Sequence, residues 1–260
     1  MSPTITSDLM TMERNQKPTA KPPRPAPRHE NRPPTLRFAP LAWLKLMIFL
    51  HAGDTEVGFF GICAKEDLLY VQDLAVPKQK VSAVTVSFDD QSVADHFEDC
   101  AAVGIQPTRC GRVWVHTHPG LSPNPSGVDE ETFARVFGNC DWAVMAIVAR
   151  GGASYARLSF SAGPGGDVMI PMVVDWGALP QEIQNREGSL DELFGGWLDE
   201  YGSRIFPEDW RPVTRSSQTG QSQPAFSDLR DTLDDLYDQM MLDQQFEDAY
   251  SDSILEGVSP

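Results

Sequence analysis

The stretch "VWVHTHPGLSPNPSGVDEE", residues 113 to 131, places two of the chain's five histidines one residue apart at the end of an apolar run. Side chains two residues apart on a β-strand face the same side, with their Cα atoms about 6.6 Å apart. His116 and His118 can therefore both point toward one ion, as two imidazole ligands of a tetrahedral zinc centre do. Pro119 offers no amide to a sheet and ends the strand. We predict a strand over residues 112–118.

The residues that follow complete a possible set of ligands. Two prolines, Pro123 and Pro125, stiffen the loop, and a helix is predicted over 129–138. Asp129 opens this helix and can turn its carboxylate back as a third ligand. Three protein ligands leave one position for water, which is typical of catalytic zinc. Taken singly, these residues are a buried polar pair, a turn serine (Ser126) and a helix cap, but their combined spacing favours a metal site.

Length and charge exclude several classes of protein. The 260 residues suffice for one well-buried domain with extensions or for two small domains. A formal net charge of -16 and a pI near 4.6 argue against a protein that coats nucleic acid, since such a protein needs a basic surface. There is no run approaching the roughly 18 apolar residues of a membrane helix, and the start lacks the pattern of a secretory signal. We expect a cytoplasmic protein that binds neither nucleic acid nor membrane.

The cysteines support the same compartment. They are scattered and contain no C-x-x-C pair, so in a chain without an export signal they are predicted to be free thiols, not disulfides or a zinc ribbon. The four residues are Cys63, Cys100, Cys110 and Cys140.

Three segments follow from composition. Residues 1–35 are proline-rich and locally basic, and we predict that they are disordered, either as a plain solvated tail or as a P-x-x-P segment for a partner. Residues 36–178 have the pattern of an α/β (α+β) domain. Residues 179–260 are acidic and mostly helical. Around 228–240 an acidic amphipathic helix is predicted, which either packs on its own domain or docks on a basic partner.

Within the central segment, helical and strand-like periods alternate. Helices are predicted over 41–53 and 92–104, the second with Ser92 as a possible cap, and a capping box at 189–192 precedes a further helix. The first two strands are close enough in sequence to form a hairpin. Strands are predicted over 56–64, 68–76, 84–88, 142–150, 154–162 and 168–174.

At the opening motif the chain resembles a known family. The pattern H-x-H, seven residues, S, two residues, D is the signature of JAMM (MPN+) metalloproteases. His116, His118, Ser126 and Asp129 fit it without a gap. The resemblance covers residues 36–178 and is closest to a compact prokaryotic-type, deubiquitinase-like isopeptidase, because the segments "VGIQPTRCG" and "SAGPGGD" are short.

The family also has a glutamate on an earlier strand that follows a helix. The stretch "LMIFLHAGDTEVGFFGI" supplies Glu56 in that context. Asp54 is a competitor, but the strand phase and the following "VGFFG" favour Glu56.

The resemblance implies a curved mixed β-sheet flanked by helices and one catalytic Zn²⁺. It implies hydrolysis of an isopeptide or peptide bond after the C-terminal tail of a ubiquitin-like protein, whose conjugates, activating enzymes and conjugating enzymes would be partners. Zinc would lower the pKa of its bound water. The implied roles are Glu56 as proton shuttle, Ser126 as oxyanion donor, and His116, His118 and Asp129 as zinc ligands.

Two alternatives stay open. A zinc peptidase acting on peptides unrelated to ubiquitin-like folds would use the same residues, and an inert MPN domain would serve as a scaffold. A nucleobase deaminase is disfavoured, because the P-C-x-x-C signature of that class is absent.

Overall fold

The computed structural model describes residues 33–178 and 190–208 of the chain. Three sequence predictions fall outside these ranges: most of the proline-rich tail at 1–35, Ser189 of the capping box, and the acidic helix around 228–240. These three stay predictions.

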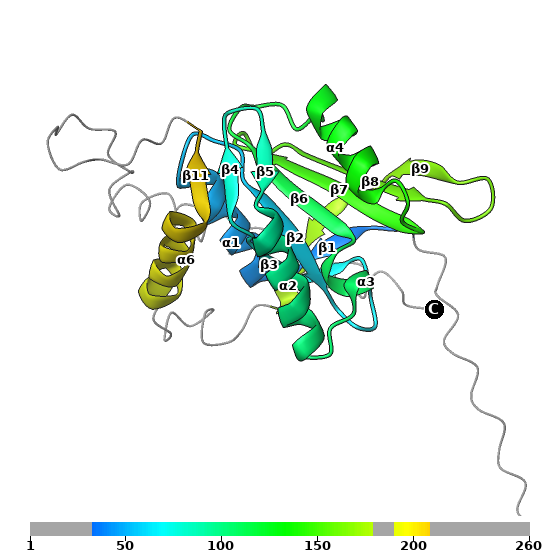
Figure 1. Cartoon of the computed structure of the whole chain (residues 1–260), viewed down its shortest axis with the longest axis horizontal. Helices are drawn as coiled ribbons and strands as arrows, with labels where there is room; N and C mark the ends of the chain where they lie inside the picture. Colours follow the sequence, from blue (N-terminus) through cyan, green and yellow to red (C-terminus); the bar gives the residue numbers. More distant parts are fainter. Residues whose placement is uncertain (1–32, 179–189, 209–260) are drawn as a thin grey trace, which may run out of the picture. The chain divides into compact units, whose positions relative to one another are not determined.

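A mixed eight-stranded sheet forms the centre of the fold (Figure 1). Its strands lie in the order β10-β1-β3-β2-β6-β7-β8-β9. The pairs β1–β10, β1–β3 and β6–β7 are parallel, and the other neighbours are antiparallel, including the predicted β2–β3 hairpin. The predicted mixed α/β class is confirmed. The strands are β1 (Leu36–Phe38), β2 (Gly58–Cys63), β3 (Tyr70–Ala75), β6 (Val113–His118), β7 (Trp142–Ala149), β8 (Ser154–Phe160), β9 (Gly166–Met169) and β10 (Met172–Val174).

The sheet curls until its two edges approach each other. Strands β9 and β10 lie at opposite edges, yet Ile170 and Pro171 are the two residues that separate them in sequence. Three residue steps span at most about 11 Å, so the edges must be close. The prediction of one strand over 168–174 is wrong, because Pro171 has no amide for a ladder and divides that segment.

Helices cover both faces of the sheet (Figure 1). Helices α1 (Pro40–His51) and α6 (Leu190–Arg204) share one core cluster with the sheet, and α2 (Asp90–Ala102) and α4 (Gly127–Phe137) pack in the other. Helix α1 is buried between the sheet and α6, as the ring of Phe49 shows. Its centroid lies 5.4 Å from that of Phe59 in β2 and 5.4 Å from that of Tyr201 in α6.

The two-residue period of β6 decides which face the histidines take. Val113 and Val115 belong to the cluster that contains α1, whereas Trp114 packs with the α4 side chains Phe133 and Phe137. His116 is in phase with Trp114, and the two rings stack with centroids 4.4 Å apart. Both histidines of the motif therefore point toward the face that α4 covers.

A smaller sheet includes β11 (Ile205–Pro207), the last described strand of the C-terminal extension. Its strands are β11, β4 (Gln79–Val81) and β5 (Val86–Phe88), in that order. Helix α6 is fixed by the buried Lys45, whose Nζ donates to the Leu74 carbonyl at 2.8 Å and pairs with Glu200 at 2.9 Å. The sequence did not predict β1, β4 or β11, each of which has three residues.

The cap of α2 differs from the prediction. Asp89 is the N-cap and accepts a hydrogen bond from the amide of Ser92, which is therefore not the cap. Ser92 instead accepts from the Lys78 amide at 2.8 Å and ties α2 to the start of β4.

Two expectations about the whole chain can be compared with the described residues. All four cysteines are free thiols, as predicted. Among the helices that the structure describes, none combines the length and the apolar character needed to cross a membrane.

Candidate metal centre

His116, His118 and Asp129 meet where β6 ends and α4 begins. Their ligand atoms all lie within 4.8 Å of one another. Asp129 Oδ1 is 3.3 Å from His116 Nε2, and Asp129 Oδ2 is 3.7 Å from His118 Nε2. Nitrogen and oxygen ligands of a tetrahedral zinc ion lie about 3.4 Å apart, given bonds of about 2.0–2.1 Å. The three side chains therefore fit one cation.

The hydrogen bonds of the histidines leave lone pairs facing this centre. His118 Nδ1 lies 2.9 Å from the Ser122 carbonyl, and since a carbonyl can only accept, Nδ1 carries the proton. The lone pair of the neutral ring is then on Nε2. Among the described residues, neither His118 Nε2 nor either ring nitrogen of His116 has a hydrogen-bond partner, although all are buried. Buried polar atoms rarely stay unpaired, and a bound cation would satisfy them.

The start of α4 fixes the third ligand. Ser126 is the N-cap of this helix, and its Oγ accepts from the Asp129 amide at 3.2 Å. Asp129 Oδ2 in turn accepts from the Ser126 amide at 2.7 Å, which completes a capping box. Asp129 is thus the third residue of α4, and the same contacts that begin the helix turn its carboxylate back toward β6.

Glu56 lies beside the three ligands, just before β2. Its side chain is buried, and Oε1 is 3.6 Å from His118 Nε2. The Glu56 amide donates to the Ser82 carbonyl at 2.8 Å. The next residue, Val57, donates to Thr117 Oγ1 at 3.0 Å and accepts from the Thr117 amide at 2.9 Å. Glu56 is therefore held from two sides, by the β4–β5 turn and by the residue between the two histidines.

Gly58 and Gln79 complete this support. The Gln79 side chain accepts from the Gly58 amide at 2.7 Å and donates to the Gly58 carbonyl at 2.8 Å. It therefore pairs with the backbone of β2 as a neighbouring strand would. A Cβ atom at Gly58 would lie 2.7 Å from Val86 and 2.8 Å from Phe88, which leaves room for glycine alone. Nothing in the sequence marks Gln79 as part of this support, because its strand is too short to show that the residue is buried.

Asp54 takes no part in the site. Its side chain is 93% exposed and pairs with Arg150 at 2.8 Å. The same guanidinium donates to the Leu50 and Gly53 carbonyls, and the Arg150 backbone amide donates to the His118 carbonyl at 3.0 Å. Arg150 thus joins the loop before Glu56 to the end of β6, a connection that no sequence signal indicated.

The environment shifts the ionisation of every group in the centre. Burial raises the pKa of Glu56 from 4.5 to about 7, with Asp129 adding to the rise and His118 opposing it. Burial lowers the pKa of His116. For Asp129, burial opposes ionisation, but the two imidazoles beside it outweigh this effect and hold the pKa well below the usual range. Burial also lowers the pKa of His118, but Asp129, the Ser122 carbonyl and Glu56 outweigh it and raise the pKa.

No family model and no curated protein matches this chain. Among solved structures, it is similar to a JAB1/MPN domain protein from Archaeoglobus fulgidus, with 16% sequence identity and a TM-score of 0.29. The match covers 54% of this chain and 98% of that chain. The likeness is too weak to carry an argument about function, which must come from the site itself.

In the metal-free protein we expect Glu56 to contribute a loss of stability as the pH rises from 4.5 to 7. In this window the folded chain keeps a proton on Glu56 that the unfolded chain has lost. Because the folded state keeps this proton, the Glu56 contribution to the free energy of unfolding falls with rising pH, by roughly 3 kcal/mol in full. Glu56→Gln should remove this loss. This loss is measured by urea unfolding of the chelator-treated wild type and variant at pH 5 and pH 8. If the substitution changes the free energy of unfolding equally at both pH values, Glu56 is not the titrating group.

Two of the cysteines are poorly suited to act as catalytic nucleophiles. Burial raises the pKa of Cys63 to about 12, and burial raises that of Cys110 to about 12 as well. A thiol must ionise to act as a nucleophile, so neither residue is suited to that role.

Proposed function

We propose that this chain is a zinc-dependent peptidase that cleaves the bond after the C-terminal tail of a ubiquitin-like protein. The bond would join that tail to a target or to the rest of a precursor. The observation that carries the proposal is the group of His116, His118 and Asp129 with the Glu56 carboxylate beside it. The resemblance of the motif to JAMM metalloproteases supports the substrate class. A cytoplasmic location, and partners that activate and conjugate the same protein, belong to the proposal.

The donor set favours zinc. Two imidazoles and one carboxylate are typical ligands of zinc in hydrolases, and three protein ligands leave a position open. When bound, zinc supplies a Lewis acid and lowers the pKa of a coordinated water. The Ser122 carbonyl fixes the tautomer of His118, as the second shell of a zinc histidine commonly does.

Glu56 has the position and the proton affinity of a shuttle. Its Oε2 is buried and has no hydrogen-bond partner among the described residues, so it is free to accept a proton from an attacking water. Burial raises the pKa of this carboxyl above its usual range in the metal-free site, which favours a group that can both take up and return a proton. Glu56 would then return the proton to the leaving amine.

Ser126 stands at the edge of the site. Its side chain is exposed, and its Oγ accepts one hydrogen bond from Asp129, which leaves its own proton free to donate. We propose that this proton is donated to the oxyanion that forms when the scissile carbonyl is attacked.

Ser126→Ala should slow turnover by about 10²–10³-fold, the usual cost of one oxyanion donor, while zinc stays bound. The substitution also removes the cap of α4, at about 1 kcal/mol. Ser126→Gly separates the two effects, because glycine costs a cap only a few tenths of a kcal/mol but lacks the hydroxyl. Turnover and urea unfolding of both variants are measured. If Ser126→Gly keeps near-normal turnover, the hydroxyl is not a donor.

The substrate class is tested with ubiquitin-like proteins that end in glycine, beginning with any encoded beside this chain's own gene. Each is fused through its tail to a reporter protein and compared with a short peptide of the same tail sequence and with unrelated peptides. We expect kcat/KM for the folded fusion to exceed that for the free tail peptide by at least about 10²-fold, since a folded surface adds binding energy. Equal rates on all peptides would favour the general peptidase, and zinc binding without turnover would favour the scaffold.

A further inference from the structure

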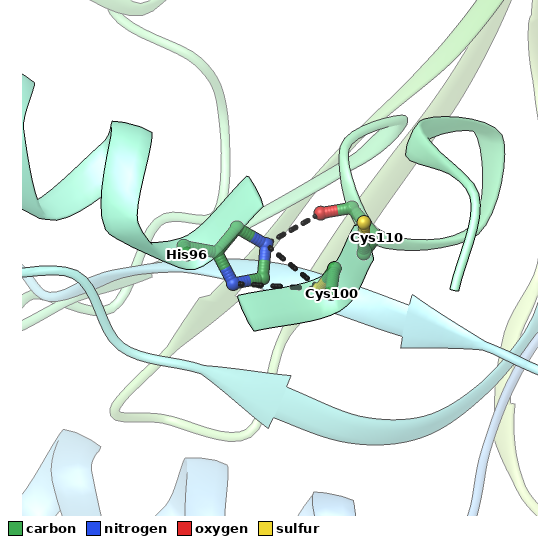
Figure 2. A group of neighbouring side chains, drawn as sticks. All are labelled: His96, Cys100 and Cys110. Carbon is green, nitrogen blue, oxygen red and sulfur yellow. Dashed lines mark hydrogen bonds between the residues drawn. The ribbon is translucent and has the colours of Figure 1, made fainter. Parts of the chain in front are cut away.

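A second group of metal-binding side chains lies next to the other end of β6. His96 and Cys100 are four residues apart on α2 and so share one face of that helix. Cys110 ends the short helix α3 (Pro107–Cys110), three residues before β6 begins. The ligand atoms of the three residues all lie within 4.8 Å of one another (Figure 2). Because six-residue β6 spans about 17 Å, this group is separate from the centre at His118.

The imidazole of His96 is already oriented as in a metal site. Its Nε2 lies 2.8 Å from the Cys110 carbonyl, and since a carbonyl only accepts, Nε2 carries the proton (Figure 2). The lone pair of the neutral ring is therefore on Nδ1. The ring also stacks on Phe60, with centroids 5.3 Å apart and planes 2° from parallel. A histidine that donates one N–H to a backbone carbonyl and keeps the other nitrogen free is the usual arrangement of a metal ligand.

The two sulfur atoms complete a compact donor set. Cys100 Sγ lies 3.9 Å from His96 Nδ1 and 4.0 Å from Nε2. A sulfur and a nitrogen bound to one tetrahedral zinc ion are about 3.6 Å apart, so Cys100 needs a shift of only a few tenths of an ångström. Cys110 starts within 4.8 Å and needs a shift of up to about 1 Å. Both thiols are buried, with Cys100 5% and Cys110 0% exposed. Cys110 Sγ donates to the Gln106 carbonyl across 3.5 Å, a contact that is easily given up.

We propose that His96, Cys100 and Cys110 form a second metal site for a thiophilic d¹⁰ cation, Zn²⁺ or Cu⁺, which fastens α2 and α3 to each other. One imidazole and two thiolates favour these ions over Mg²⁺ or Ca²⁺. As each metal–sulfur bond forms, the thiol releases its proton to water, so no oxidant or reductant is needed. Water completes the shell of a four-coordinate ion. The role is structural, since α3 leads directly into the strand that carries His116.

The test uses Cd²⁺ as the probe, added to the metal-free full chain under reducing conditions. Thiolate bonded to Cd²⁺ gives a charge-transfer absorption in the near ultraviolet, whereas the centre at His116, His118 and Asp129 has no sulfur and gives none. We expect this band to saturate when one equivalent of Cd²⁺ is bound to the thiolates. Zn²⁺ and Cu⁺ are then each titrated against the cadmium form, and the ion that displaces Cd²⁺ at the lower concentration is the one that the site prefers.

Variants assign the band to residues. Cys100→Ser and Cys110→Ser should each lower it by at least half and weaken Cd²⁺ binding by more than about tenfold, and His96→Gln should weaken binding without abolishing the band. Cys140→Ser is the matched control, because this thiol lies outside the group, and it should change nothing. The wild-type titration needs no variant, so it decides the question even if a variant fails to fold.

Three results would overturn the proposal: no thiolate band when Cd²⁺ is in excess over both sites, an unchanged band in both Cys100→Ser and Cys110→Ser, or loss of the band in Cys140→Ser. Displacement of Cd²⁺ by neither Zn²⁺ nor Cu⁺ would overturn the choice of ion. Peptidase activity is not a readout, so failure of this site and failure of the proposed function are distinguishable.

Discussion

Glu56→Gln should lower turnover by about 10⁴-fold or more while zinc stays bound. A glutamine keeps the shape and the backbone contacts of Glu56 but cannot accept a proton. General acid-base catalysis contributes about 10²–10⁴-fold, and Glu56 would act twice, once on the attacking water and once on the leaving amine. Its carboxylate is 3.6 Å from His118 Nε2, outside the group of three ligands. Turnover of a tail-fused substrate and zinc per chain are measured together.

The control for this variant is Asp54→Asn, which removes a carboxylate two residues away. Asp54 points into solvent toward Arg150, so we expect its loss to leave turnover within about twofold, the size of a surface substitution. A Glu56→Gln protein with near-normal turnover would show that the proton acceptor lies elsewhere. Loss of zinc from Glu56→Gln would instead mean that Glu56 is a ligand.

His118→Ala should remove both the metal and the activity. The centre then keeps His116 and Asp129 alone, and since disturbing a second-shell contact already costs 10–100-fold in affinity, we expect zinc to bind at least about 10²-fold more weakly. Turnover should fall by more than about 10³-fold. The wild type should carry about one zinc ion per chain more than the variant. This difference measures the occupancy of this centre even where zinc also binds at another site.

Removal of the metal by a chelator tests the same centre without a substitution. Dialysis against a chelator should abolish turnover, and added Zn²⁺ should restore it in the wild type but not in His118→Ala. Cys140→Ser, which removes a thiol remote from the ligands, should behave as the wild type. Full activity in a preparation with no bound metal would exclude the proposed chemistry.

Much of the site could be predicted from the sequence because its parts follow short-range rules. The spacing of His116 and His118 matches the period of a strand, and the structure places both on one face. Asp129 comes three residues after a serine, the spacing of a capping box, and the box turns its carboxylate back. These rules act within about fourteen residues, where turn and cap chemistry decide the geometry.

What the sequence did not reveal depends on contacts between distant segments. The curl of the sheet follows from the division of residues 168–174 at Pro171, which a local period does not show. Gln79 supports Gly58 from a strand of three residues, and Arg150 reaches across to the loop before Glu56. His96 and Cys100 had a signal, since a histidine and a cysteine four apart share a helix face, but Cys110 joins them through the turn into β6.

The distance in sequence between Glu56 and its partners has a consequence for folding. Residues 116–129 bring the three ligands together within one strand, one loop and one helix, whereas Glu56 is 60 residues before His116 and reaches the site through the pairing of β2 with β6. Local contacts form early and distant strand pairing forms late. Under the proposed function, a partly folded chain would acquire its ion before its proton acceptor and would bind metal without hydrolysing a substrate. Hydrolysis would then report the completed domain, and metal uptake would report one segment of it.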